Sequence, residues 1–115
     1  MNTATQSRPW GYYQVLFEGS QFKVKVLVID PGQSISLQYH NDRSENWTIV
    51  KGMALVTKGD MKLPLSAGSS VFIPVGVVHR LRNVGKSHLQ VIEVQTGKHL
   101  SEDDIVRLQD EYGRS

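Results

Sequence analysis

The sequence has 115 residues, of which 13 are Lys or Arg and 11 are Asp or Glu, so its formal net charge is only +2. It contains no cysteine, which excludes disulfides, thiolate metal sites and cysteine nucleophiles. A chain of this length can bury the core of one domain, and its scattered basic residues argue against nucleic acid as a partner.

The N-terminal stretch lacks the basic start and apolar run of a signal peptide. No segment approaches the roughly eighteen apolar residues that a membrane span needs. We therefore expect a cytoplasmic protein that has no membrane partner. Residues 1–7 are polar and are expected to form a flexible lead, with residues 8–115 as a single domain.

Short segments rich in branched and aromatic residues alternate with turn residues along most of the chain. After a turn at residues 8–11, strands are predicted over residues 12–18, 21–30, 34–40, 45–51, 53–58, 61–65, 70–74, 79–82 and 89–95. Gly59-Asp60 reads as a two-residue hairpin turn. Strands at such even spacing predict an all-β sandwich or barrel.

The segment 21–30 alternates clearly between two faces. One face carries Phe22, Val24, Val26 and Val28, and the other carries Lys23, Lys25, Leu27 and Ile29.

The C-terminal segment departs from the strand pattern. Ser101 is followed by three acidic residues, as at the N-terminus of a helix. Ile105, Val106, Leu108 and Tyr112 then recur at helical spacing. We expect one short helix to close the domain.

Four side chains with nitrogen or oxygen donors suggest a metal site. Gln38 and His40 are two positions apart and would point to the same side of a strand, and Glu45 follows just past the next turn. Together with His79 they would suit one divalent ion. The alternative is that the two histidines are ordinary polar residues at strand ends.

The spacing of these residues resembles that of the cupin family. The cupin motifs G-x5-H-x-H-x4-E-x6-G and G-x5-P-x-G-x2-H-x3-N match Gly32, His40, Glu45 and Gly52, then Gly68, Pro74, Gly76, His79 and Asn83. Gln38 stands where most cupins have the leading histidine. The resemblance implies a double-stranded β-helix, or jelly-roll barrel, and favours the metal interpretation. Asp42 is a second choice in place of Gln38, but it leaves too few residues before Glu45 for the motif.

Longer stretches resemble one branch of that family. RPWGYY, PGQSISLQYH, RSENW, IPVGVVHRLRNVGK and LSEDDIVRLQDEYGR are similar to the C-terminal isomerase domain of type II mannose-6-phosphate isomerase / mannose-1-phosphate guanylyltransferase. That family has further histidines where this chain has Asn41, Asp42 and Asn46. The resemblance implies a metal-dependent enzyme that interconverts mannose 6-phosphate and fructose 6-phosphate through an enediol. The sequence has no glycine-rich phosphate loop, so guanylyltransferase activity is expected to be absent.

The resemblance also suggests cofactors and site residues. Zinc is the first choice of metal, although manganese, cobalt, iron and nickel accept the same donors. Glu93 would be a general base at the barrel mouth, where burial would raise its pKa. Lys25 and Arg107 complete the candidate catalytic set, and Arg80 and Arg107 would bind the substrate phosphate. Each of these residues can also be an ordinary charged side chain at the surface.

Two other functions compete with the isomerase. A cupin that binds a sugar phosphate or sugar nucleotide without turnover would explain the missing histidines. A small metal dioxygenase is the other, and it would need iron and oxygen. In every case the partner is a small molecule, and an exposed apolar sheet would favour a homodimer.

Overall fold

The structure is a computed structural model, and it describes residues 4–113. In this range every element is a strand, which confirms the predicted all-β class. The strands are β1 (Thr5–Arg8), β2 (Gly11–Glu18), β3 (Phe22–Ile29), β4 (Leu37–Tyr39), β5 (Ser44–Lys51), β6 (Met53–Lys58), β7 (Met61–Ser66), β8 (Ser70–Ile73), β9 (His79–Asn83), β10 (Leu89–Thr96) and β11 (Val106–Gln109).

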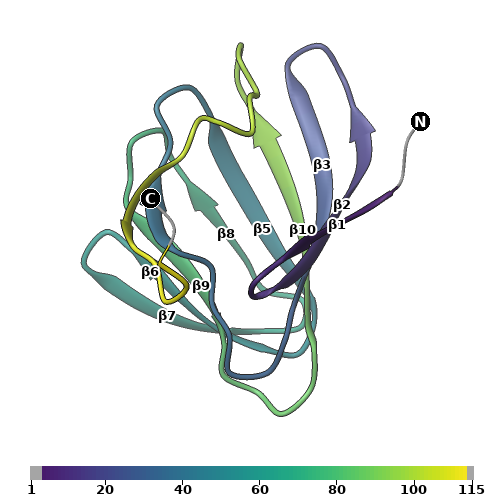
Figure 1. Cartoon of the computed structure of the whole chain (residues 1–115), viewed down its shortest axis with the longest axis vertical. Coiled ribbons are helices and arrows are strands. Elements are labelled where there is room, and N and C mark those ends of the chain that lie inside the picture. The colour runs from purple at the N-terminus through teal and green to yellow at the C-terminus, as the bar shows by residue number, and fades with distance from the viewer. Residues whose placement is uncertain (1–3, 114–115) are drawn as a thin grey trace.

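The strands form two facing antiparallel sheets (Figure 1). The six-stranded sheet has the order β1-β2-β3-β10-β5-β8, and the five-stranded sheet has the order β11-β4-β9-β6-β7. Strands that are distant in sequence therefore lie side by side, such as β3 beside β10 and β4 beside β9. This interleaving brings the segment around residue 40 next to the start of β9.

The core lies between the two sheets and is made of alternate residues of the strands. Its buried members include Leu27, Ile29, Trp47, Ile49, Val56, Ile73, Leu81, Leu89 and Val91. The predicted hairpin at Gly59-Asp60 is confirmed, because Lys58 pairs with Met61 across it. Gly59 has a φ of 58°, as the first central position of a type II′ turn requires.

The N-terminal segment is more ordered than the sequence suggested. Thr5–Arg8 forms β1 and pairs with β2, so the expected flexible lead is wrong for residues 5–7. All four side chains of β1 are exposed, so backbone pairing rather than apolar burial holds this strand. Residues 1–3 lie outside the described part of the chain.

The predicted C-terminal helix is wrong. The capping signal at Ser101 is real, since its Oγ accepts a hydrogen bond from the Asp103 backbone N–H at 3.1 Å. The turn does not continue into a helix, however, because the chain extends at Val106 and pairs with β4 as β11. Hydrogen bonding to the backbone N–H and C=O groups at the edge of β4 thus stabilises an extended segment more than the helical spacing of its apolar residues stabilises a helix. Figure 1 shows this segment crossing from β10 to the other sheet.

Within residues 4–113 no helix is long and apolar enough to cross a membrane. The predicted homodimer concerns a second chain and stays a prediction. Exposed apolar side chains such as Phe72 on β8 and Phe22 on β3 would be candidates for such a contact.

Candidate metal centre and the adjoining cavity

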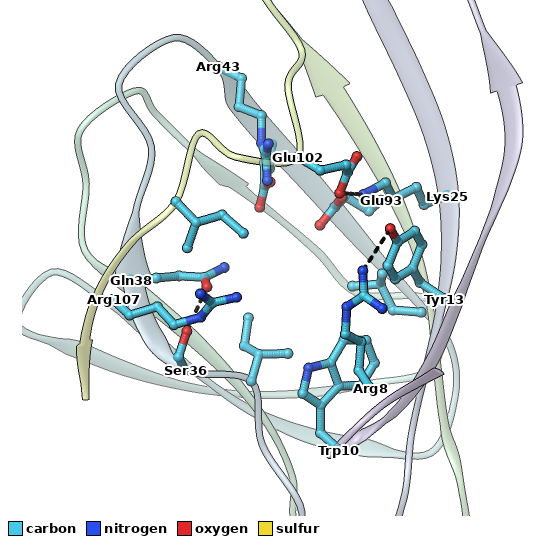
Figure 2. A pocket seen from close by; sticks show the side chains of 14 residues that line it. Arg8, Trp10, Tyr13, Lys25, Ser36, Gln38, Arg43, Glu93, Glu102 and Arg107 are labelled. Carbon is cyan, nitrogen blue, oxygen red and sulfur yellow. Dashed lines mark hydrogen bonds and ion pairs between the residues drawn. The ribbon is translucent and has the colours of Figure 1, made fainter. Parts of the chain in front are cut away.

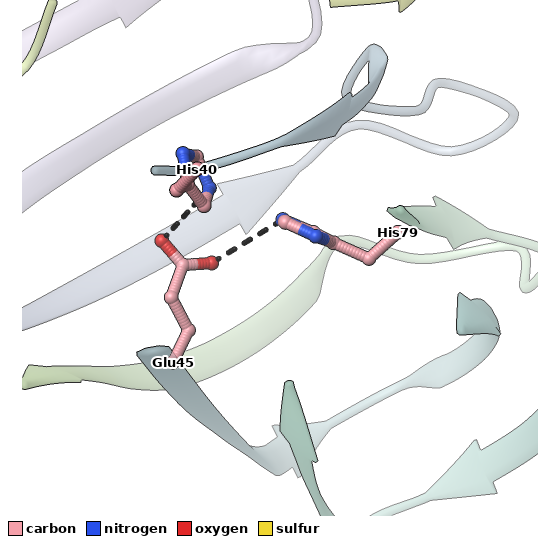
Figure 3. Close-up of side chains that lie close together, drawn as sticks. All are labelled: His40, Glu45 and His79. Atoms are coloured by element: carbon pink, nitrogen blue, oxygen red, sulfur yellow. Dashed lines mark ion pairs between the residues drawn. The ribbon is translucent and has the colours of Figure 1, made fainter. Parts of the chain in front are cut away.

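Three residues from both sheets converge in the interior (Figure 3). His40 follows the short strand β4, Glu45 is the second residue of β5, and His79 begins β9. Glu45 points inward because it lies in phase with the buried Trp47 on β5. His79 is placed beside the β4 segment because its backbone pairs with Gln38.

The three side chains are almost completely buried, at 0–2 % exposure. His40 Nε2 lies 3.2 Å from Glu45 Oε2, and His79 Nε2 lies 3.5 Å from Glu45 Oε1. The three ligand atoms all lie within 4.8 Å of one another. These distances leave the donors close enough to share one ion.

Backbone carbonyl groups fix the orientation of both imidazole rings. His40 Nδ1 lies 2.5 Å from the Asp104 carbonyl oxygen, and His79 Nδ1 lies 2.9 Å from that of Val77. Because a carbonyl oxygen only accepts hydrogen bonds, each Nδ1 must carry the proton. Both Nε2 atoms then face the Glu45 carboxylate. Histidines that bind metals are oriented in this way.

The centre holds buried polar atoms that lack a hydrogen-bond partner among the described residues. Glu45 Oε1 and His79 Nε2 are both buried, and neither has a hydrogen-bond partner among the described residues. Burial raises the pKa of Glu45, but its contacts with His40, His79 and Arg43 outweigh burial and hold that pKa well below its usual range. A buried carboxylate that faces two imidazole Nε2 atoms fits a divalent cation better than it fits an empty core.

Arg43 belongs to this centre, although the sequence analysis did not identify it. Its Nε donates to Glu45 Oε2 at 2.9 Å, and its NH1 donates to the Ser101 carbonyl oxygen at 3.0 Å. The side chain is 4 % exposed. Arg43, Glu45 and Trp47 are alternate residues and so lie on the same side of the chain, and this spacing was the available signal. The sequence predicts residues 41–44 as a connection between two strands, which hid it.

The predicted ligand Gln38 lies at the edge of the centre. It is buried, and its Oε1 accepts a hydrogen bond from Ser36 Oγ at 2.7 Å. Gln38 and Glu45 line the same cavity. Its role as a fourth ligand stays a prediction. Asp42, the second choice, is exposed, and its backbone N–H donates to Asp104 Oδ2 at 2.9 Å.

A cavity with about 630 Å³ of empty space, part of it open to solvent, adjoins the centre (Figure 2). The lining is rich in charge and aromatic rings, from Arg8, Trp10, Tyr13, Lys25, Arg43, Glu45, Glu93, Glu102 and Arg107. Four of these residues are cationic, which favours an anionic ligand despite the three carboxylates.

The predicted acid-base residue Glu93 lies in this cavity wall. It is 5 % exposed, and its two oxygens accept hydrogen bonds from Trp47 Nε1 at 3.0 Å and from Gln95 Nε2 at 2.7 Å. Burial and then the negative charge of Glu45 raise the pKa of Glu93, against the opposing effects of Lys25, Arg43 and the Trp47 hydrogen bond. A catalytic role for Glu93 stays a prediction.

Replacing Glu93 with Gln is expected to remove one part of the pH dependence of stability. Because the pKa of Glu93 is raised in the folded state, the folded chain binds more protons than the unfolded chain above the ordinary value of 4.5. Stability is therefore lost as the pH rises from 4.5 through the folded pKa. The variant can keep its hydrogen bonds, because the Gln95 amide can turn its unpaired Oε1 toward the new NH2.

Urea unfolding of both proteins over a series of pH values checks this prediction. The free energy of unfolding of Glu93→Gln minus that of the parent should increase as the pH rises. The exposed Glu18 provides a control for the change in net charge, because Glu18→Gln removes one carboxylate in the same way. Parallel curves for Glu93→Gln and the parent would show that the Glu93 carboxyl does not titrate as the structure indicates.

The predicted cations fall into two groups. Lys25 and Arg107 line the cavity. Lys25 lies on β3, and Arg107 on β11 pairs with Gln38. Arg80 follows His79 on β9 and points to the opposite face of that strand, where its NH2 donates to the Gln109 carbonyl oxygen at 3.3 Å.

Known structures share this fold. A protein from Klebsiella pneumoniae described as having a double-stranded beta-helix domain superposes with a TM-score of 0.77 at 23 % identity, over 91 % of this chain and 90 % of that one. The cupin domain of Schizosaccharomyces pombe Cnp3 gives a TM-score of 0.72 at 16 % identity, over 75 % of this chain and 64 % of that one. These similarities confirm the cupin fold.

Sequence relatives correct the predicted activity. The xanthan biosynthesis protein XanB of Xanthomonas campestris is 51 % identical, and a mannose-1-phosphate guanylyltransferase of Salmonella montevideo is 50 % identical, each over 94 % of this chain. The chain spans only 23 % of the length of each relative and matches their C-terminal part. These relatives are named for xanthan biosynthesis and for guanylyltransferase activity, and neither is named as an isomerase. The prediction of a stand-alone mannose-6-phosphate isomerase that lacks guanylyltransferase activity is therefore wrong.

A family of protein domains also matches almost the whole sequence. The family is described as the mannose-6-phosphate isomerase C-terminal domain, and its match covers residues 2–110. That span includes His40, Glu45 and His79 and all the cationic residues of the cavity. The chain therefore belongs to the mannose-6-phosphate isomerase C-terminal family of cupins.

Proposed function

We propose that this chain binds a divalent metal ion and a phosphorylated sugar side by side, as the cupin part of a function related to mannose-1-phosphate guanylyltransferase. The relatives support the mannose phosphate, because one is named for acting on it and others are named for xanthan and alginate biosynthesis. The cavity supports an anionic ligand, because four cations line it beside the candidate metal centre.

The observation that carries the proposal is a buried pair of polar atoms, Glu45 Oε1 and His79 Nε2, which have no hydrogen-bond partner among the described residues. The other two atoms of the centre, Glu45 Oε2 and His40 Nε2, have only Arg43 as their donor within residues 4–113, at 2.9 and 3.5 Å. Two histidine Nε2 atoms face one carboxylate, and both Nδ1 atoms are committed to backbone carbonyl groups. Nature rarely buries acceptors without donors, so a cation among them accounts for the arrangement. We propose that His40, Glu45 and His79 hold the ion, with Gln38 as a fourth donor. Zinc suits two imidazoles and a carboxylate.

Each side of the cavity would have its own part in binding. A bound divalent ion would add positive charge at the inner end, where it attracts oxygen atoms of a sugar ligand. Arg107 and Lys25 would meet the phosphate group. Trp10 lines the cavity and would pack against the apolar side of a sugar. The ring of Tyr13 is not available for this role, because the Arg8 guanidinium lies 4.9 Å and Lys25 Nζ 4.2 Å from its centre. Glu93 can accept hydrogen bonds from sugar hydroxyl groups.

Calorimetric titration of the metal-loaded chain tests the proposal. Mannose 1-phosphate is expected to bind in a saturable manner, at least about tenfold more tightly than mannose, because the phosphate supplies charge-assisted hydrogen bonds. Removing the metal with a chelator should weaken the binding. A folded, metal-loaded chain that binds no sugar phosphate would contradict the proposed function.

Two arginines provide a matched pair of variants for the same titration. Arg107→Met removes a cation from the cavity and is expected to weaken mannose 1-phosphate binding by about tenfold or more. Arg80→Met removes an equally half-buried arginine from the outer face of β9 and should leave the affinity within about twofold. Equal effects of the two changes would place the phosphate elsewhere.

A further inference from the structure

Two lysines of β3 are buried, Lys25 at the wall of the cavity and Lys23 at a second hollow beside it. Lys23 is 9 % and Lys25 is 4 % exposed, and both point to the interior face of the strand. Buried lysines are rare because removing their charge from water is costly unless an anion accompanies them. One carboxylate serves both: Glu102 Oε1 lies 2.7 Å from Lys25 Nζ, and Glu102 Oε2 lies 3.1 Å from Lys23 Nζ.

The anion and the cations differ in how they are held. Both lysines lie on a strand that pairs with β2 on one side and β10 on the other. Glu102 instead lies in a turn of the segment that crosses between the sheets, and its side chain is 41 % exposed. Contacts of Ser101 with Arg43 and of Asp104 with His40 hold the backbone of this turn. The carboxylate can therefore leave by rotating its partly exposed side chain toward solvent, whereas the lysines stay fixed in the sheet.

Glu102 also fills the space between two hollows. It lines the cavity of Lys25 and Tyr13, and it lines a second hollow that includes Lys23 and Tyr13. Tyr13 forms a side-chain hydrogen bond with Glu102 and accepts another from Arg8 NH2 at 3.2 Å. Figure 2 shows Lys25, Tyr13 and Arg8 on the same side of the cavity as Glu102. Removing the carboxylate would leave a place with several donors directed at it.

We propose that Lys23 and Lys25 form a phosphate-binding subsite that the Glu102 carboxylate occupies in the free protein, and that the phosphate group of a ligand displaces it. This inference rests on the proposed function, since it adds Lys23 to the two cations, Lys25 and Arg107, that would meet the phosphate there. The arrangement lowers the affinity for phosphate by the fraction of time that Glu102 is in place. In return, the two lysines are never left without an anion.

The balance of charge favours such an exchange. The charges of Lys25 and Lys23 outweigh the effect of burial and lower the pKa of Glu102, so the carboxylate is ionised at neutral pH. One negative charge then faces two ammonium groups. A phosphate monoester carries about −1.5 to −2 at pH 7 and would neutralise both. It would also accept the hydrogen bond of Tyr13 that Glu102 now takes.

The alternative is an ordinary ion pair that only fastens the crossing segment. In that case loss of the carboxylate destabilises the chain, and phosphate has no special effect. The phosphate subsite and the ordinary ion pair therefore predict different responses to inorganic phosphate, which has no sugar with which to contact the rest of the cavity.

The test is a calorimetric titration of the 115-residue chain with inorganic phosphate. It compares the parent with Glu102→Gln and Glu111→Gln. Glu111 is the matched control, because it pairs with Arg82 at 3.0 Å and its side chain is 40 % exposed. Glu102→Gln is expected to bind phosphate at least about tenfold more tightly than the parent, since the competing carboxylate is gone. Glu111→Gln should match the parent.

Two further measurements keep the test decisive if Glu102→Gln folds poorly. Lys25→Gln should lose phosphate binding. In the unmodified chain, phosphate should shift the amide resonances of residues 23–25 and 101–103 before others. Unchanged phosphate affinity in Glu102→Gln, or shifts elsewhere, would overturn the inference. Metal-dependent binding of mannose 1-phosphate in those same proteins would show that the proposed function survives such a failure.

Discussion

Replacing His79 with alanine is expected to lower the zinc affinity of the chain by at least about a hundredfold. His79 Nε2 is buried without a hydrogen-bond partner among the described residues, and it faces Glu45 Oε1 at 3.5 Å. Its Nδ1 is held by the Val77 carbonyl oxygen, so the ring presents one nitrogen to the centre. Without this donor, His40 and Glu45 alone would hold an ion only weakly.

The fold should survive this change. His79 contacts the rings of His40 and Trp47 at one end of the interior, whereas the apolar core continues between the sheets at Ile49, Leu81 and Val91. Far-ultraviolet circular dichroism should therefore match that of the parent. Competition of the protein with a chromophoric chelator, together with elemental analysis, would measure the bound zinc.

The exposed His88 provides the control for that experiment. Its Nε2 lies 3.2 Å from Asp30 Oδ1, and its side chain is 62 % exposed. His88→Ala should bind zinc like the parent. Stoichiometric tight zinc in His79→Ala would remove this residue from the ligand set, and an equal loss in both variants would mean that the metal binds at surface histidines.

The sequence alone located the main residues of the centre. The spacing of His40, Glu45 and His79 follows from which strands must be neighbours in a cupin, and the structure brings these three side chains together. Glu93 was placed correctly on the interior face of its strand because strict alternation leaves only two choices. The alternation of apolar and polar residues along a strand therefore indicates which side chains share one face.

The features that the sequence did not predict depend on contacts between segments that are distant in the chain. The alternation of β3 was clear, but nothing in it showed that the face with Lys23 and Lys25 is the buried one. That face packs into the core through Leu27 and Ile29, and Glu102, almost eighty residues later, supplies the anion that its two lysines need. The same crossing segment was predicted as a helix from local signals. Pairing with the edge of β4, which local sequence does not encode, decided its conformation.

Replacing Arg43 with methionine is expected to cost about 3–5 kcal/mol of folding free energy in the metal-free chain. The guanidinium group is buried and donates to Glu45 Oε2 at 2.9 Å and to the Ser101 carbonyl oxygen at 3.0 Å. Methionine fills a similar volume but leaves the buried Glu45 carboxylate without its cation. Urea unfolding in the presence of a chelator would measure the loss.

Arg82→Met separates this effect from the general cost of losing an arginine. Arg82 NH1 lies 3.0 Å from Glu111 Oε1, but both side chains are about 40 % exposed, so its loss should cost at most about 1 kcal/mol. Adding zinc should return part of the stability of Arg43→Met, because a cation at the centre would again neutralise Glu45. Equal costs for the two arginines would mean that Glu45 does not depend on its buried partner. A large cost that zinc leaves unchanged would argue that the metal binds away from Glu45.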